Sequence, residues 1–357
     1  MKILAYHLLN DCSGSPKVLR TALEGLAGRG HSIELVTSRG GVLDGLDDCG
    51  VKIHRVGYRF TSCVAATAMR FAWAQARMFW SALRRAGHDK VVLVNTILPV
   101  GAALGARLRG AKVVYYYHEN AYIKSSLYRL LAKCMLMLAR KVVCVSEFQR
   151  SYLPADAPAV VVPNVLPADF AVRLNPDAEA AFSRRNVLMV SSLKRYKGID
   201  EFYGLATRMP DAGFTLVVND TADNIHAYEA RQELSRPLNL TVHPRQDDIA
   251  RFYNEATVVL NLTDRRVAVE TFGLTILEAM AAGLPVIVPT CGGIAELVTD
   301  GENGYKRDAG HLDRIAACLR VLLSDKALYK AMAGEALVTS GRYDHDSYIE
   351  NLERQLS

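Results

Sequence analysis

Two glutamates stand eight positions apart, at Glu270 and Glu278, around the predicted start of a helix. That start lies at Phe272 to Leu274, where Gly273 allows another group to approach the backbone closely. A helix N-terminus carries unpaired N–H groups and partial positive charge, so it binds phosphate readily. Glu278 lies roughly 9 Å along the helix axis, and its side chain tilts back towards the start. A diphosphate at the helix start would therefore leave an attached ribose within reach of the Glu278 carboxylate.

Glu270 precedes this helix, on the side where a sugar attached to the diphosphate would lie. Two acids fit one anion-binding site if each of them meets hydroxyls rather than phosphates. Taken singly, either acid is better explained as a helix-terminal or solvated surface charge. Together with the glycine at the helix start and the predicted strand Pro285–Val288 behind it, the two acids favour a ligand site.

The segment from Glu270 to Pro285 resembles the E-x7-E signature of retaining glycosyltransferases with the GT-B fold, specifically the large family 4. The similarity continues through residues 292–298 and 300–305, and extends loosely into the first half of the chain. It implies an α/β fold of two Rossmann-like domains that face each other across a cleft. It also implies transfer of a hexosyl group from a UDP- or GDP-sugar to a hydroxyl, with retention at the anomeric carbon.

The same resemblance implies a role for each residue of the segment. The ribose would be held by Glu278 and the transferred sugar by Glu270. The leaving phosphate would itself assist deprotonation of the acceptor, so no dedicated base, no metal and no cofactor besides the donor is expected. The diphosphate would be held by the backbone amides of four consecutive residues: Phe272, Gly273, Leu274 and Thr275.

A basic loop, residues 191–198, follows the first predicted strand of the second half. In similar enzymes this loop supplies an arginine and a lysine that neutralise the donor diphosphate, and Lys197-Gly198 match the lysine and its glycine. Where the family often has glycine and arginine, this chain has Ser191-Ser192, so Lys194 is the substitute candidate for the second charge. Such cations matter because the leaving diphosphate gains negative charge as the sugar bond breaks.

His118 follows a predicted strand of the first half, in the segment Tyr117–Asn120. The carboxyl ends of strands are where open α/β sheets bind ligands. A lone histidine is more often structural, but similar enzymes place a histidine here that faces the transferred sugar. We therefore expect His118 to act as a hydrogen-bonding group rather than as a general base.

Two further positions are weaker candidates. Gly14 is the one glycine kept from a loop that is glycine-rich in related proteins, near the acceptor and the donor phosphate. The loop lacks a G-x-G-x-x-G pattern, which counts against a dinucleotide-binding dehydrogenase. Arg245 lies in a loop that would contact the base, by analogy of position only.

The sequence Asp344-His345-Asp346 formally matches a metal-binding D-x-D pattern. It stands immediately before a predicted terminal helix, where capping explains such residues better. No metal is therefore predicted.

Two predicted helices mix large apolar and basic residues, at 69–85 and 124–141. Both would suit contact with an anionic membrane surface, and both would equally suit core-packed helices with basic outer faces. Because many similar enzymes glycosylate lipid-linked acceptors, the expected acceptor is a glycan or a glycolipid, in the assembly of cell-surface polysaccharide.

Short β-branched runs alternate with longer helical stretches, which predicts parallel βαβ architecture. We expect domains at 1–167 and 168–343 and a terminal helix over 344–357 that could pack on either. The clearest strand candidates are Ile33–Thr37, Lys90–Asn95, Lys112–Tyr117, Lys141–Ser146, Val187–Ser191, Phe214–Asn219, Val258–Leu262 and Pro285–Val288.

Composition places limits on the class of protein. The 357 residues suffice for two cores, and 50% of them are hydrophobic. No apolar run approaches a signal peptide or a membrane span, so we expect a cytoplasmic location, possible membrane contact aside. Seven scattered cysteines fit a reducing compartment. The formal charge of +6 suits phosphates or lipid surfaces but is too weak to indicate nucleic acid.

Two alternatives stay open at this point. A nucleotide-sugar 2-epimerase would share the architecture and the nucleotide site, but would act on its sugar nucleotide without any acceptor. A bilobed sugar-binding protein would share the two α/β lobes, but should carry an export signal.

Overall fold

The computed structural model describes residues 1–59, 61 and 63–357, except for the side chain of Lys124. The chain divides into two compact units, Met1–Asn164 together with His345–Ser357, and Val165–Asp344. The division lies three residues before the boundary placed from sequence, and the terminal helix α16 (His345–Leu356) belongs to the first unit.

The first unit is built on a parallel sheet in the order β3-β2-β1-β4-β5-β6-β7. Valine, leucine and tyrosine fill its central strands because both faces of a parallel sheet are covered. The strands are β1 (Lys2–Tyr6), β2 (Ser32–Thr37), β3 (Lys52–Arg55), β4 (Lys90–Asn95), β5 (Lys112–Tyr117), β6 (Lys141–Cys144) and β7 (Ala159–Val161).

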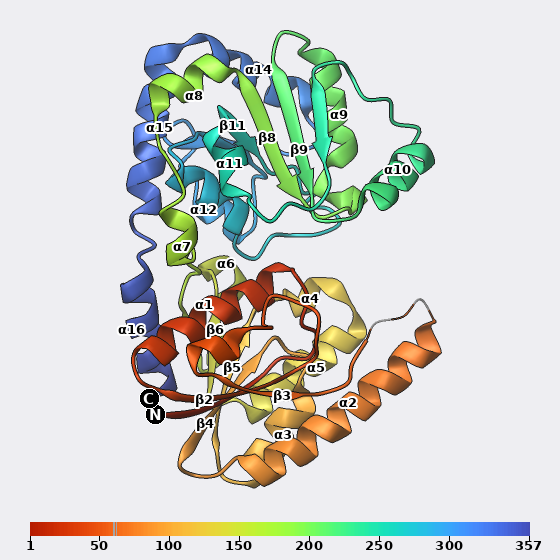
Figure 1. The fold of residues 1–357 in the computed structure, drawn as a ribbon, viewed down its shortest axis with the longest axis vertical. Coiled ribbons are helices and arrows are strands. Elements are labelled where there is room, and N and C mark those ends of the chain that lie inside the picture. The colour runs from red at the N-terminus through yellow and green to blue at the C-terminus, as the bar shows by residue number, and fades with distance from the viewer. Residues whose placement is uncertain (60, 62) are drawn as a thin grey trace. The chain divides into compact units, whose positions relative to one another are not determined.

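The helices of the first unit cover the two faces of this sheet (Figure 1). On one face α1 (Gly14–Gly28) packs against α16, and on the other α2 (Val64–Arg85) and α5 (Ser126–Leu138) pack around α3 (Val100–Leu108). The short elements are η1 (Leu46–Cys49), α4 (Ala121–Lys124) and α6 (Glu147–Arg150).

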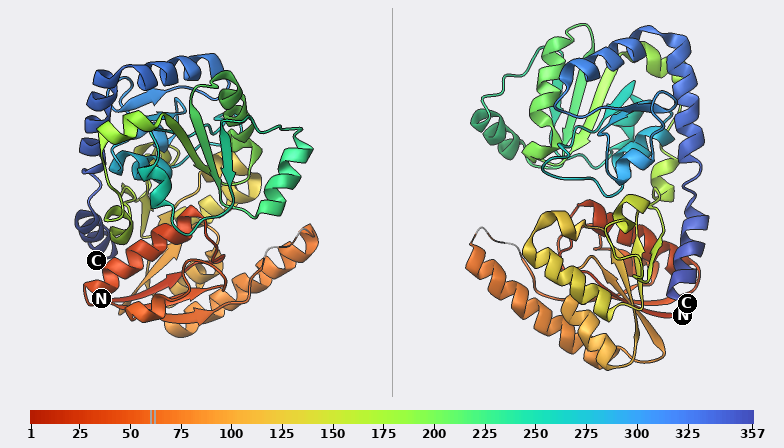
Figure 2. Two further views of the ribbon diagram at one scale, coloured as in Figure 1. Left: turned by 45° about the horizontal axis from the view of Figure 1, so that its top comes forward. Right: turned by 180° about the vertical axis from the view of Figure 1, so that it is seen from behind.

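Helix α16 brings the C-terminus beside the N-terminus, as the views agree (Figure 2). The hydroxyls of Tyr348 on α16 and Tyr116 on β5 are 2.9 Å apart in the buried interior. Arg29 and His31 both contact the carboxylate of Glu353, at 3.0 and 2.8 Å. These contacts fix the end of the chain to the first unit.

The second unit contains a parallel sheet in the order β10-β9-β8-β11-β12-β13. The strands are β8 (Asn186–Ser191), β9 (Gly213–Val218), β10 (Leu240–His243), β11 (Val258–Leu260), β12 (Val286–Val288) and β13 (Gly304–Lys306). Both sheets therefore place their first strand between the second and the fourth, as doubly wound nucleotide-binding folds do.

The helices of the second unit pack in two groups. Helix α9 (Ile199–Arg208) packs on α14 (Leu312–Ser324), and α12 (Leu274–Ala281) packs on α15 (Lys326–Ser340), which also contacts α8 (Ala178–Arg184). The shorter elements are α7 (Ala168–Ala171), η2 (Arg195–Lys197), α10 (Ala222–Arg231), α11 (Ala250–Asn254) and α13 (Gly293–Glu296).

The predicted strands all exist, most of them within one or two residues of their predicted ends. The predicted start of the central helix is also confirmed, since α12 begins at Leu274 with Gly273 as its N-cap.

Candidate functional site

The candidate site of the second unit lies at the carboxyl ends of its central strands. The order of strands reverses at β8, which stands between β9 and β11. Ligands of open α/β sheets bind at such a switch point. Lys197 follows β8, Glu270 follows β11 and Gly292 follows β12, so the loops that carry them meet at one edge of the sheet.

Gly198 holds the lysine loop against the loop after β11. Its φ is +80°, and a Cβ there would stand 2.3 Å from both the Cβ and the carbonyl oxygen of Leu262. Only glycine fits this position without displacing backbone. The N–H of Asp264 donates to the carbonyl of Tyr196 at 2.7 Å and closes the same contact. Lys197 is thereby fixed beside residues 261–264.

Lys197 and Glu270 form an ion pair whose side chains are each 22% exposed. Thr263 Oγ1 donates to the same Glu270 oxygen at 2.9 Å. Burial opposes ionisation of Glu270, but the charge of Lys197 and these hydrogen bonds hold its pKa below the ordinary value. The sequence assigned Lys197 to the diphosphate and Glu270 to the sugar, and the structure brings the two side chains together.

Helix α12 begins in a conformation that requires glycine. The φ of Gly273 is +113°, and a Cβ there would stand 2.5 Å from Cγ1 of Ile294. The carbonyl of Gly273 accepts from the N–H groups of Ile276 and Leu277 at 3.0 and 3.1 Å. Within the described part of the chain, the N–H groups of Leu274 and Thr275 have no acceptor. The helix thus presents the unpaired amides that an anion needs.

Glu278 is half-buried one to two turns further along α12 and is held by a tyrosine. Tyr253 on α11 is fully buried, and its hydroxyl donates to Oε2 of Glu278 at 2.5 Å. Burial and the neighbouring carboxylate raise the pKa of Tyr253 well above its ordinary value, so the hydroxyl keeps its proton. Glu278 is therefore held by a protein hydrogen bond, and its assignment to a ribose stays a prediction.

Three other predicted positions lie around this edge. Lys194 is exposed and caps η2, without an ion pair to any described residue. Arg245 is exposed after β10, and its Nε donates to Oδ1 of Asn219 at 2.7 Å. The side chain of Phe272 is buried and packs edge-on against Tyr343, so only the backbone of Phe272 could meet a ligand.

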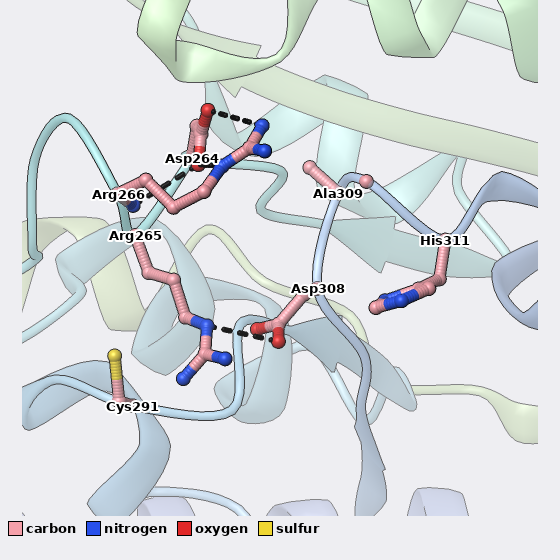
Figure 3. A pocket seen from close by; sticks show the side chains of 8 residues that line it. Asp264, Arg265, Arg266, Cys291, Asp308, Ala309 and His311 are labelled. Atoms are coloured by element: carbon pink, nitrogen blue, oxygen red, sulfur yellow. Dashed lines mark hydrogen bonds and ion pairs between the residues drawn. The ribbon is translucent and has the colours of Figure 1, made fainter.

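A polar pocket of about 330 Å³ adjoins the same loop (Figure 3). Arg265 reaches Asp308 at 3.0 Å, and Arg266 folds onto Asp264 at 2.9 Å. In each of these two pairs a carboxylate offsets the charge of an arginine at the surface of the pocket. The sequence singled out no residue of this pocket, which is lined by Asp264, Arg265, Arg266, Cys291, Asp308, Ala309, Gly310 and His311.

His118 of the first unit follows β5, which pairs with β4, so it lies at the carboxyl edge of the sheet one strand beyond the switch point between β1 and β4. Its Nε2 is 2.8 Å from Oδ1 of Asn95, and its ring centroid lies 4.3 Å from that of Tyr116. Burial lowers the pKa of His118 to about 3, so the ring is neutral near pH 7. A neutral ring agrees with a hydrogen-bonding role.

Gly14 is the first residue of α1, and a Cβ there would meet nothing within 4 Å. Its position therefore does not require glycine for steric reasons. Of the D-x-D residues, Asp344 precedes α16 and Asp346 lies in its first turn. Among the described residues, no group of three His, Cys, Asp or Glu side chains could hold a metal ion.

Helices α2 and α5 carry apolar residues on outer as well as inner faces. Met78, Leu131 and Met135 are buried in the core. The exposed apolar residues are Val64, Met69, Trp73 and Trp80 on α2, and Leu127, Leu130 and Met137 on α5. Lys124, in the second predicted segment, has a side chain outside the described part of the structure. Among the described helices, none combines the length and the apolar character of a membrane span.

The fold resembles that of several solved proteins over the whole chain. Anabaena HepE, in complex with UDP and glucose, superposes with a TM-score of 0.81 at 18% identity, covering 100% of this chain and 99% of that one. Sucrose-phosphate synthase from Thermosynechococcus elongatus superposes with a TM-score of 0.80 at 18% identity, covering 99% and 98%.

Two family models identify the class of enzyme to which the chain belongs. Residues 177–337 match the model "Glycosyl transferases group 1", and residues 13–170 match "Glycosyltransferase Family 4". This chain is a glycosyltransferase with the GT-B fold. The glycosyltransferase is 23% identical over 275 residues to an uncharacterized glycosyltransferase of Haemophilus influenzae, covering 73% of this chain and 74% of that one.

A shorter match joins the glycosyltransferase to N-acetyl-alpha-D-glucosaminyl L-malate synthase of Bacillus anthracis. The two are 35% identical over 92 residues, which is 26% of this chain and 23% of that relative. This match spans about a quarter of the relative's length, so it carries no conclusion about that enzyme's reaction here.

Sequence reasoning missed the residues of the glycosyltransferase that orient the predicted ones. Thr263 contacts Glu270, Tyr253 contacts Glu278, and Asn95 contacts His118. The position of Asn95 at the end of a predicted strand was a usable signal. No sequence signal marked Tyr253, because the contact between α11 and α12 cannot be predicted from the local sequence of either helix.

Proposed function

We propose that this glycosyltransferase transfers a hexosyl group from a UDP- or GDP-sugar to a hydroxyl of a glycan or lipid-linked acceptor, with retention at the anomeric carbon. The observation that carries the proposal is the arrangement of α12. Two amides without a described acceptor open the helix, and a carboxylate held by a buried tyrosine follows one to two turns later. This spacing suits a diphosphate and the ribose attached to it.

The proposed reaction uses no dedicated base and relies on the charges of the site. In the proposed step the bond between the anomeric carbon and the diphosphate oxygen breaks, a bond to the acceptor oxygen forms, and the acceptor proton passes to the leaving diphosphate. Lys197, with Lys194, would stabilise the charge that develops there. Glu270 pairs with Lys197 in the structure. A donor sugar that forms hydrogen bonds with Glu270 would leave the ammonium of Lys197 available to the diphosphate.

Structures similar to this chain support the choice of donor. HepE has been solved in complex with UDP-glucose, and a structure described as "Trehalose-6-phosphate from E. coli" is bound with UDP-2-fluoro glucose. We propose that no metal and no cofactor besides the donor takes part. The cation for the diphosphate would be the lysine itself.

The outward apolar and basic residues of α2 and α5 support a second element of the proposal. We propose that they contact an anionic membrane surface, which would place the cytoplasmic enzyme beside a lipid-linked acceptor in polysaccharide assembly. Trp73 and Trp80 are 65% and 55% exposed, which is unusual for tryptophan in a core-packed helix.

The test is a thermal-shift screen of UDP, GDP and their sugar conjugates, followed by a product assay. A nucleoside diphosphate that binds at 100 times its Kd should add about 2.7 kcal/mol to the free energy of unfolding. Products should form only when an acceptor is added. Turnover of the sugar nucleotide in the absence of acceptor would instead indicate an epimerase, and binding of free sugar without nucleotide would indicate a sugar-binding protein.

A further inference from the structure

A second polar pocket adjoins the pocket of Figure 3, beside the edge strand β13 of the second unit's sheet. Its volume of about 460 Å³ lies within the range of small-molecule sites. Asp308 and His311 line both pockets, and none of the residues predicted to hold the donor lines the second one. The second pocket is lined by Thr290, Lys306, Arg307, Asp308, His311, Arg314, Ala317 and Cys318.

Positive charge exceeds negative charge in the second pocket. Its lining contains three cations, Lys306, Arg307 and Arg314, and one carboxylate, that of Asp308. Burial raises the pKa of the Cys318 thiol above its ordinary value, so this side chain adds no negative charge near pH 7. The surface of the pocket is therefore positive and suits an anion.

Two of these charges are already offset by residues outside the second pocket. Arg307 donates to Oδ1 of Asp300 at 2.8 Å, and the same oxygen accepts from the backbone N–H of Lys306 at 2.7 Å. Asp308 pairs with Arg265 at 3.0 Å. The carboxylate of Asp308 is thus engaged from the side of the first pocket, and Asp300 is engaged by Arg307.

The other two cations of the pocket have no acidic partner. Lys306 is half-buried at the end of β13, and Arg314 is exposed in the first turn of α14. Among the residues that the structure describes, neither side chain forms an ion pair. Partial burial removes hydration from the ammonium of Lys306, which is unfavourable unless a counter-ion replaces it. An anion between these two side chains would supply that counter-ion.

The start of α14 adds backbone donors beside the same two side chains. This helix has 13 residues, and within the described ranges of the chain the N–H groups of Leu312 and Asp313 have no acceptor. Such amides carry partial positive charge and bind phosphate oxygens. The carboxylate of Asp313 lies 3.7 Å from Arg208 and does not line the pocket, so it does not oppose an anion there.

We propose that the second pocket binds a small phosphate-bearing anion, held by the side chains of Lys306 and Arg314 and by the backbone N–H groups at the start of α14. Two cations match the charge of a phosphate dianion, and charge-assisted hydrogen bonds to its oxygens are strong. Inorganic phosphate and a phosphate monoester of a small metabolite share this chemistry. The pocket is larger than a phosphate group needs, so it has room for the organic part of an ester.

The test is calorimetric titration of the whole chain with inorganic phosphate, glycerol 3-phosphate and glycerol, at an ionic strength held constant with sodium chloride. Both phosphates should bind, and glycerol should not. Lys306→Gln and Arg314→Gln should each weaken binding roughly 5-fold to 20-fold. The control is Arg320→Gln, at an exposed arginine of the same helix that does not line the pocket, and it should leave the affinity unchanged.

The same titrations distinguish the two sources of the anion. Tighter binding of glycerol 3-phosphate than of inorganic phosphate would indicate a metabolite ester, and equal or weaker binding would indicate free phosphate. The proposal is wrong if neither phosphate binds at millimolar concentration. It is equally wrong if Lys306→Gln and Arg314→Gln both bind phosphate as tightly as the wild type does.

Backbone amide NMR locates the anion without any substitution. In the wild type, the N–H signals of Leu312 and Asp313 should shift as glycerol 3-phosphate is added. Shifts at Leu274 and Thr275 alone would place the anion at α12 and overturn the proposal. In Lys197→Met, the affinity for glycerol 3-phosphate should be unchanged.

This inference does not depend on the proposed donor. If no sugar nucleotide binds in the ligand screen, the proposed function fails, while the titrations with phosphate still decide whether the second pocket is an anion site. If the second pocket binds no phosphate, the assignment of the donor to α12 is unaffected, because the two sites share no residue.

Discussion

Lys197 and Glu270 form an ion pair although they follow different strands, β8 and β11, and lie 73 positions apart in the chain. Each side chain keeps 22% of its surface exposed, so the pair is held by protein and still open to a ligand. The carboxylate that would meet the sugar thus positions the ammonium that would meet the diphosphate. The proposed roles of the two residues would couple stability and catalysis through this one contact.

Replacement of Lys197 by methionine should affect both properties. Glu270 would keep its charge without a partner, which should cost about 1–3 kcal/mol of unfolding free energy, nearer the lower value because water reaches the pair. Turnover should fall roughly 10²–10³-fold. The double variant Lys197→Met/Glu270→Gln should recover stability but not turnover, as urea unfolding and a product assay can measure. Near-normal turnover in Lys197→Met would refute the assignment of the lysine.

The same pair predicts a dependence of stability on pH. The pKa of Glu270 in the folded state lies below the ordinary value of 4.5, so its ionised form stabilises the fold above that value. The contribution is lost as the pH falls through the lowered pKa. The difference in unfolding free energy between wild type and Glu270→Gln should therefore be constant above about pH 5.5 and shrink below about 4.5. A difference that grows on acidification would contradict the ion pair.

Gly273→Ala should displace the start of α12. The new Cβ would stand 2.5 Å from Ile294, at a φ that alanine avoids, so we expect a loss of at least about 1 kcal/mol and much weaker nucleotide binding. The control is Gly334→Ala, at an exposed position inside α15 where a Cβ meets nothing, which should be neutral or stabilising. Calorimetric titration with UDP and GDP compares the two, and unchanged affinity in Gly273→Ala would argue against the helix start as the anion site.

Membrane contact through α2 can be tested by vesicle flotation. The wild type should float with vesicles that contain anionic lipid and should release in high salt. Trp73→Glu with Trp80→Glu should abolish flotation, because both exposed rings would be replaced by charge. Leu238→Glu, at an exposed apolar residue of the second unit, serves as the control. If the wild type stays in the bottom fraction of the gradient in the presence of anionic vesicles, the membrane hypothesis is wrong.

The fold class could be predicted from the sequence because local hydrophobic patterns specify most of its strands and helices. Alternating β-branched runs and helices specified the parallel sheets, and Gly273 located the start of α12. The side on which α16 packs could not be predicted, because it depends on the contact of Tyr348 with Tyr116, 232 positions away.

The site was predicted only in part for a similar reason. Glu270, Glu278 and His118 were visible as chemical groups in a recognisable order, whereas the pairing of Glu270 with Lys197 and of Glu278 with Tyr253 arises from loops that meet in space.

The most direct test of the account is calorimetric titration with a nucleoside diphosphate and its 2′,3′-dideoxy analogue, on wild type and Glu278→Ala. Glu335→Ala, at an exposed glutamate of α15, is the control. The account predicts that wild type and control prefer the ribose form about 10-fold or more, and that Glu278→Ala loses this preference while still binding both ligands. A preference that survives in Glu278→Ala, or a wild type that binds neither ligand, would contradict the central claim that α12 holds a diphosphate at its start and a ribose at Glu278.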